Sequence, residues 1–234
     1  MPSYPEDSLQ HYVDSWWESD GSKTLEKGRL IRGFVHHVDE QPRRLIPIGR
    51  AEDATEHSRA LVQVEVFRKS TYKKTSGLPV AAFPLREGEE YFVFRGKVNR
   101  PMLILAAPGE GVPDELRRGA ARYQTAPTLL VAPYYGVDRS GKRGGWSPAF
   151  VDRIRHIEYP QYMWDALPTP GAEESILRLD HVLAVGRSPE AYDITPHRLT
   201  EKARGILDEW LCWIFTGKLD DGGPISYLRT ELRA

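Results

Sequence analysis

Asn99-Arg-Pro-Met-Leu-Ile-Leu105 and Thr128-Leu-Leu-Val-Ala-Pro133 are the two stretches of sequence that decide the fold. Each is a short apolar run that begins or ends at a proline, which is the pattern of a buried β-strand. We therefore expect strands at residues 101–106 and 128–132. Two buried strands this close in the chain make a mainly β protein the first hypothesis.

Further strand patterns flank these runs, and clusters of Pro and Gly separate them. They cover residues 29–37, 45–48, 60–67, 90–94 and 175–185. Residues 149–157 fit either a strand or a helix. Apolar residues at helical spacing predict a short helix at residues 9–17 and a longer one at residues 196–215, capped by Thr195 and begun by Pro196. The expected fold class is mainly β with helices (α+β), a small barrel or sandwich with helices packed on it.

The composition is that of a globular chain. The 234 residues carry a formal net charge of −1, and 40% are hydrophobic and 28% charged, which excludes low-complexity disorder and coiled coils. The longest apolar runs have six residues, too few to span a membrane, and the first residues lack the pattern of a secretory signal. A single cysteine cannot form an internal disulfide. We therefore expect a cytoplasmic protein with no membrane contact.

Positive charge is concentrated in one part of the chain. Residues 117–156 contain eight Lys and Arg but two acidic residues, with aromatic residues between them. Such a mixture suits single-stranded nucleic acid, because cations neutralise phosphates and aromatic rings stack on bases. The alternative is a solvated loop whose charge is balanced by neighbouring acids. The nucleic-acid-binding residues predicted from this stretch are Tyr134, Arg139, Lys142, Arg143, Trp146 and Arg155.

The Gly-rich segment Gly136-Val-Asp-Arg-Ser-Gly-Lys142 follows the expected strand at residues 128–132 and is close to a P-loop pattern. Arg143 stands where that pattern needs a hydroxyl to hold Mg²⁺. A basic loop that contacts a nucleic-acid backbone is therefore the better interpretation. His36 and His37 point to opposite faces of a strand and cannot easily share a metal. We expect no metal and no cofactor.

Three segments in order resemble the MazF/PemK family of toxin ribonucleases. The first is Glu87-Gly-Glu-Glu-Tyr-Phe-Val-Phe94 followed by Asn99-Arg-Pro-Met-Leu-Ile-Leu105, the second is Thr128-Leu-Leu-Val-Ala-Pro133, and the third is Glu174-Ser-Ile-Leu-Arg-Leu-Asp-His-Val182. A terminal helix then closes the domain, so the resemblance spans residues 88–217. It implies a Src-homology-3-like small β-barrel of the MazF/PemK type with a C-terminal helix and an N-terminal β-rich extension.

The resemblance also implies an activity, which is metal-independent cleavage of single-stranded RNA by attack of the substrate's 2′-hydroxyl. That chemistry needs a base, an acid and a cation on the phosphorane. The residues predicted for these roles are Arg100, on the family's Arg-Pro, together with Tyr135, Asp138 and His156. The expected partners are single-stranded RNA and an antitoxin protein, in a homodimer or in a pseudo-dimer within one chain.

The sequence departs from the family at two places. The residues that usually follow the family's proline are replaced by Tyr134, Tyr135 and Gly136, and a Gln in the third segment is replaced by His181.

The sequence predicts an N-terminal region at residues 1–85, the barrel with its helix at 86–217 and a tail at 218–234. Two alternatives to the ribonuclease stay open, a non-catalytic barrel that binds nucleic acid and one that binds a protein partner.

Overall fold

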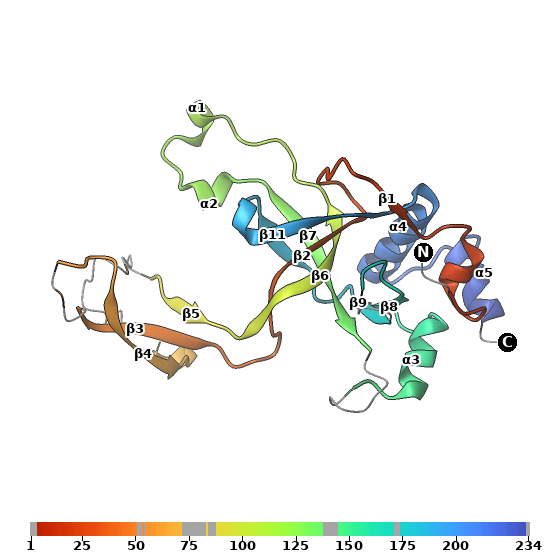
Figure 1. The fold of residues 1–234 in the computed structure, drawn as a ribbon, viewed down its shortest axis with the longest axis horizontal. Helices are drawn as coiled ribbons and strands as arrows, with labels where there is room; N and C mark the ends of the chain where they lie inside the picture. Colours follow the sequence, from red (N-terminus) through yellow and green to blue (C-terminus); the bar gives the residue numbers. More distant parts are fainter. Residues whose placement is uncertain are drawn as a thin grey trace. The chain divides into compact units, whose positions relative to one another are not determined.

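The chain divides into two compact units. The computed structural model describes residues 4–50, 53, 55–71, 83, 88–137, 145–170 and 174–232 (Figure 1). The first unit comprises residues 1–35 and 98–234, and the second comprises residues 36–97. The first unit thus combines the first 35 residues with most of the expected barrel, residues 86–217. No helix among the described residues is long and apolar enough to cross a membrane.

The main sheet curls into a half-barrel, and the protein is mainly β, as the sequence predicts. Its neighbouring strands follow the order β1-β11-β2-β6-β7-β9-β8, and β10 pairs with β7. The strands are β1 (Trp17–Ser19), β2 (Arg29–His36), β6 (Gly96–Ala106), β7 (Thr128–Gly136), β8 (Tyr162–Asp165), β9 (Ser175–Arg178), β10 (Leu183–Gly186) and β11 (Tyr192–Leu199). The predicted strands at 101–106 and 128–132 therefore lie side by side, as β6 and β7.

Antiparallel pairing assigns each residue of β6, β7, β9 and β8 to one of two faces. Met102 lies opposite Pro133, and Tyr134 lies opposite Leu177. Met163 of β8 also pairs with Leu177. Because side chains alternate along a strand and opposite residues share a face, Tyr134, Leu177 and Met163 point to one side of the sheet, and their chain neighbours point to the other.

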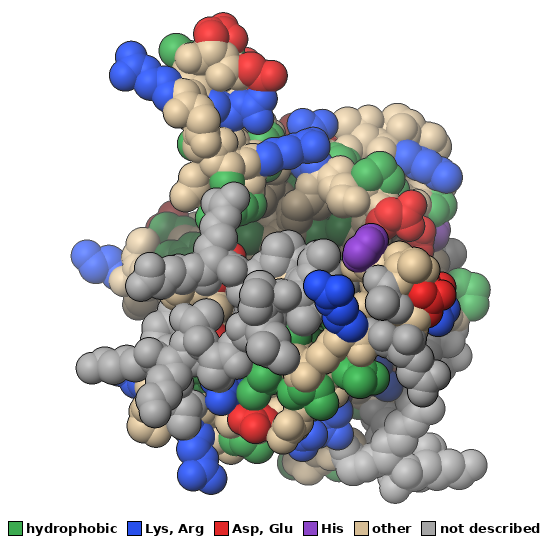
Figure 2. Space-filling model, turned by 90° about the vertical axis from the view of Figure 1, so that its left-hand side faces the viewer, with side chains coloured by type: hydrophobic (Ala, Val, Ile, Leu, Met, Phe, Trp, Pro, Cys, Tyr) green, Lys and Arg blue, Asp and Glu red, His purple; other side chains and the backbone are tan. Residues whose placement is uncertain are grey.

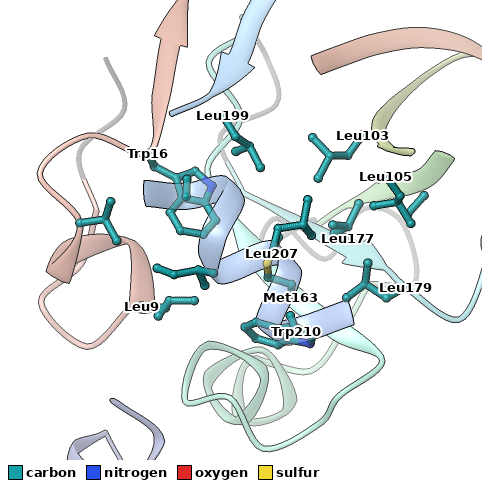
Figure 3. Packing of buried hydrophobic residues seen from close by; sticks show 14 of the residues in the cluster. Leu9, Trp16, Leu103, Leu105, Met163, Leu177, Leu179, Leu199, Leu207 and Trp210 are labelled. Atoms are coloured by element: carbon teal, nitrogen blue, oxygen red, sulfur yellow. The ribbon is translucent and has the colours of Figure 1, made fainter. Parts of the chain in front are cut away.

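The larger hydrophobic cluster fills the first of these faces, under helix α4 (Glu201–Thr216) (Figure 3). Leu207 and Trp210 of α4 lie among side chains from β6, β8 and β9 (Figure 3). The helix begins after Thr200, whose hydroxyl accepts a hydrogen bond from the Ala203 amide, and ends at Gly217 with φ +70°. A left-handed residue at this position is a common helix stop, and glycine adopts it without a Cβ penalty.

The predicted start of this helix was wrong. Thr195 and Pro196 lie in β11, where the Thr195 hydroxyl donates to the Leu30 carbonyl. The β11·β2 register shifts between Ile194 and Arg198. A proline is tolerated there because a bulge does not need its missing N–H.

Residues 9–17 do not form the expected helix along their whole length. Leu9–Tyr12 form a 3₁₀-helix, η1, and Trp17 begins β1, which pairs with β11. Trp16 and Trp17 are both buried. Their spacing from Leu9 fits a helical face, but the segment gains backbone pairing to the sheet instead.

Four further segments refine the sequence prediction or differ from it. Residues 149–157, which fitted a strand or a helix, form helix α3 (Pro148–Arg155), whose N-cap Ser147 accepts from the Phe150 amide. The predicted single strand at 175–185 is interrupted by a turn and forms β9 and β10. The expected tail contains helix α5 (Pro224–Glu231). The long segment between β6 and β7 holds two short helices, α1 (Asp114–Arg117) and α2 (Arg122–Thr125).

The second unit contains a three-stranded antiparallel sheet. Its order is β4-β3-β5, with strands β3 (Arg43–Arg50), β4 (Ala60–Val66) and β5 (Tyr91–Val93) and a short 3₁₀-helix, η2 (Lys69–Thr71). These strands confirm the strand patterns at residues 45–48, 60–67 and 90–94.

Candidate functional site

Arg100 and Tyr135 meet on the face of the sheet opposite to α4. Met102 of β6 pairs with Pro133 of β7. Arg100 stands two residues before Met102, and Tyr135 stands two residues after Pro133. If the antiparallel pairing is continued, the side chains of Arg100 and Tyr135 therefore lie opposite each other on one face. The Arg100 guanidinium carbon lies 4.1 Å from the centre of the Tyr135 ring. A guanidinium at this distance is held by the electron density of the ring. The structure therefore brings together two of the four predicted catalytic residues.

The Arg100 guanidinium donates a hydrogen bond at one edge and is buried at another. Its Nη1 donates to the Tyr134 carbonyl at 3.0 Å, whereas its Nε–H is buried and has no hydrogen-bond partner among the residues that the structure describes. Burial lowers the pKa of Arg100 from its usual value. A buried donor without a partner carries a desolvation cost.

His181 fixes the hydroxyl of Tyr135. The Tyr135 oxygen lies 3.0 Å from His181 Nδ1, and Arg178 Nη2 lies 2.7 Å from His181 Nε2. A guanidinium can only donate, so Nε2 accepts, and the neutral ring then carries its proton on Nδ1. Nδ1–H donates to the Tyr135 oxygen. The phenolic proton of Tyr135 is then not used in this hydrogen bond.

Asp180 orients Arg178 in turn. Two hydrogen bonds of 2.7 Å join the Asp180 carboxylate to Nε and Nη2 of Arg178. Burial acts against the charge of Arg178, but the hydrogen bond and charge of Asp180 outweigh it, so the pKa of Arg178 is raised. Burial likewise acts against the charge of Asp180, yet the hydrogen bond and charge of Arg178 lower the pKa of its carboxyl group. A polar chain from Asp180 through Arg178 and His181 thus ends at the Tyr135 hydroxyl.

Sequence reasoning missed Arg178, Asp180 and His181 as site residues. His181 was noted only as a replacement in the third segment. The segment Arg178-Leu-Asp-His181 was the available signal, because it places a guanidinium, a carboxylate and an imidazole within one turn at the end of β9.

Tyr134 does not have the predicted role. Its side chain is 1% exposed in the core, and its hydroxyl donates to Asp165 at 3.0 Å. The indole N–H groups of Trp16 and Trp17 also donate to this carboxylate, at 3.3 and 3.2 Å. The ring therefore cannot stack on a base. Tyr134 instead joins the N-terminal segment to β7 beneath the site.

Arg100, Tyr135, Arg178, Asp180 and His181 are together called the Arg100 group. His156 and Arg155 lie at the end of α3, outside this group. His156 Nε2 is 3.2 Å from an Asp7 carboxylate oxygen, and Arg155 pairs with Asp7 and Asp152. Residues 148–155 are helical, so Asp152 and His156 do not lie on one face of a strand. The positive charge of Arg155 is matched by acids on both sides, which does not favour its predicted role at a phosphate.

The other predicted site residues are divided between described and undescribed parts of the chain. Trp146 is half-buried before α3, with its ring stacked on Phe150. The predictions for Asp138, Arg139, Lys142 and Arg143 concern positions outside the described residues.

Much of the described basic stretch is balanced by acids. Arg153 bonds Glu158 at 2.7 Å, and Arg117 pairs with Asp114. Figure 2 shows acidic and basic side chains together at the top of the view, over the segment that carries α1. This mixture favours the alternative interpretation, charge balanced by neighbours, for those parts of residues 117–156.

Comparison with known proteins does not assign the site. No family model, no curated protein and no solved structure matches this chain. The MazF/PemK resemblance thus stays an expectation from the three sequence segments. Among the residues that the structure describes, no three His, Cys, Asp or Glu side chains are grouped so that they could hold a metal ion.

Proposed function

We propose that the chain is a metal-independent endoribonuclease that cleaves single-stranded RNA at the Arg100–Tyr135 pair. One observation carries the proposal, a guanidinium 4.1 Å from the centre of a phenol ring whose hydroxyl oxygen lies 3.0 Å from His181 Nδ1. Cleavage of a phosphodiester needs a cation for the oxyanion and a proton donor for the leaving oxygen. Arg100 and Tyr135 supply these two groups in adjacent strands.

The reaction follows from these roles. The 2′-hydroxyl of the substrate attacks the neighbouring phosphorus, so a bond from O2′ to phosphorus forms and the bond from phosphorus to O5′ breaks. Arg100 donates to the phosphorane oxygens, and the Tyr135 proton passes to O5′. The His181 Nδ1–H then remains as a hydrogen-bond donor to the phenolate oxygen. The products are a 2′,3′-cyclic phosphate and a 5′-hydroxyl end.

The base that takes the 2′-hydroxyl proton is assigned from sequence. Asp138 stands three residues after Tyr135 and is the predicted carboxylate closest to it along the chain. The finer fold assignment, a Src-homology-3-like barrel of the MazF/PemK type, belongs to the same proposal. It is supported by the antiparallel neighbours β6, β7 and β9 with α4 packed on them. An antitoxin partner and a homodimer or pseudo-dimer also follow from the resemblance.

Arg100→Ala tests the site assignment. We expect the cleavage rate to fall about 10²–10³-fold, because one preorganised donor to developing charge is lost. Arg100→Lys should fall by a similar factor, since an ammonium cannot copy the planar fork of a guanidinium. Rates are measured on an unstructured RNA in the presence of EDTA, and circular dichroism and thermal unfolding verify that each variant is folded.

Arg187→Ala is the matched control. Arg187 is exposed and follows Gly186, which pairs with Thr128 at the other end of β7 from Tyr135. Its removal should leave the rate unchanged. A folded Arg100→Ala variant that cleaves RNA at the wild-type rate would show that the phosphate does not lie at Arg100.

A further inference from the structure

Four aromatic side chains form a cluster next to the Arg100 group. They are Trp146, Phe150, Tyr159 and Tyr162, which we call the aromatic platform. Trp146 stacks on Phe150 with ring centres 5.4 Å apart and planes 23° apart. Phe150 also lies 5.3 Å from Tyr159 and 5.6 Å from Tyr162, centre to centre. The four rings therefore form one continuous group contributed by the residue before the N-cap of α3, by α3 itself, by the segment between α3 and β8, and by the start of β8.

The platform is the partly exposed edge of a hydrophobic cluster. The centre of that cluster is fully buried and includes Val151, Ile154 and Ile176. Each platform ring keeps an intermediate exposure. Aliphatic side chains would satisfy packing alone, whereas partly exposed aromatic rings can present a flat face to a ligand.

Arg178 connects the platform to the site. Tyr162 of β8 lies opposite Arg178 of β9, whose guanidinium carbon is 4.8 Å from the centre of the Tyr162 ring. The same carbon lies 5.9 Å from the centre of the Tyr135 ring. The Arg178 guanidinium therefore contacts both Tyr162 of the platform and Tyr135, the proposed acid. At the far side of the platform, the guanidinium carbon of Arg153 lies 5.0 Å from the centre of the Tyr159 ring.

We propose that the aromatic platform binds an unpaired base of the RNA strand whose phosphate lies at Arg100. The inference rests on the proposed function for that phosphate. Rings with guanidinium groups over or beside them are the arrangement that holds single strands, because every base offers a flat face for stacking. A base inside a duplex is stacked on its neighbours and cannot lie on the platform. The platform would thus select single-stranded over paired RNA.

The test uses RNA that the protein cannot cleave. A single-stranded oligonucleotide made entirely of 2′-O-methyl nucleotides has no attacking hydroxyl, and 2-aminopurine at successive positions reports stacking as a loss of fluorescence. We expect quenching by the wild-type protein at a limited set of positions. The same oligonucleotide annealed to its complement should show none.

Trp146→Leu and Phe150→Leu remove stacking surface but keep apolar bulk. Each should weaken binding of the single strand about 5- to 150-fold, the equivalent of the ~1–3 kcal/mol typical for one base stacked on an aromatic side chain. The dependence of affinity on salt should stay the same, because no phosphate contact is lost. Phe215→Leu is the matched control, since Phe215 is 71% exposed near the end of α4, and it should bind as the wild type does.

The outcomes separate this inference from the proposed function. Wild-type quenching that is lost in both variants supports the platform even if the protein cuts no RNA, in which case only the cleavage proposal fails. Absence of quenching at every position, or quenching that persists in both folded variants, overturns the platform and leaves cleavage to its own test. Equal affinity for single strands and duplexes would overturn it as well.

Discussion

Tyr135→Phe should lower the rate of RNA cleavage about 10²–10⁴-fold, the usual contribution of a positioned proton donor. The substitution removes only the hydroxyl. The phenylalanine ring still offers its face to Arg100, which lies 4.1 Å from the ring centre in the wild-type protein, so the guanidinium should stay in place. RNA binding should change little, because the lost group acts on the leaving oxygen.

The measurement for Tyr135→Phe is a single-turnover rate with saturating protein, which separates the chemical step from binding. Tyr227→Phe is the control, since Tyr227 on α5 is 64% exposed and its hydroxyl has no part in the proposed reaction. Wild-type rates in a folded Tyr135→Phe variant would mean that another group protonates the leaving oxygen.

Asp165→Asn should remove a large pH dependence of stability. Asp165 is fully buried, and burial raises the pKa of its carboxyl group from 3.8 to about 7, although hydrogen bonds from Trp17, Tyr134 and Trp16 act in the other direction. The folded protein therefore keeps a proton that the unfolded chain releases near pH 4. This residue's contribution to the free energy of unfolding falls as pH rises from about 4 to about 7, by roughly 4 kcal/mol in total.

Urea unfolding at several pH values between 4.5 and 8 measures this effect. Other titrating groups cancel when the free energy of unfolding of Asp165→Asn is subtracted from that of the wild-type protein. This difference, wild type minus variant, should fall steadily as the pH rises to about 7 and then level off. A difference that is constant over the whole range would show that Asp165 is ionised with an ordinary pKa in the folded state.

The strands were predictable where the pattern is local. Apolar runs bounded by Pro and Gly located β2, β3, β4, β5, β6 and β7, because burial on a sheet leaves a direct mark on the sequence. β8 and β11 were missed. Each contains residues that favour other structures, Asp165 in β8 and Pro196 in β11, and each is held by partners distant in the chain. Long-range pairing decided these segments over local preference.

The site was predictable only in part, for the same reason. Arg100 and Tyr135 were found through the sequence resemblance, but two adjacent tyrosines do not reveal which one faces the core. The register of Met102 with Pro133 decides it, and that register puts Tyr135 with Arg100. Arg178 joins them because β9 pairs with β7 and β8. His156 was misplaced because the spacing of residues 149–157 allowed a strand as well as a helix.

The most direct test of the account is the chemistry of the RNA ends that the wild-type protein produces in EDTA. The cut sites are first mapped on an unstructured RNA, and a second RNA then carries a single 2′-deoxynucleotide on the 5′ side of one cut. We predict 2′,3′-cyclic phosphate and 5′-hydroxyl ends. Cleavage should be lost at the deoxy-substituted linkage, while the other sites are still cut. Ends with a 3′-hydroxyl and a 5′-phosphate, cleavage at the deoxy linkage, or intact RNA would contradict the account.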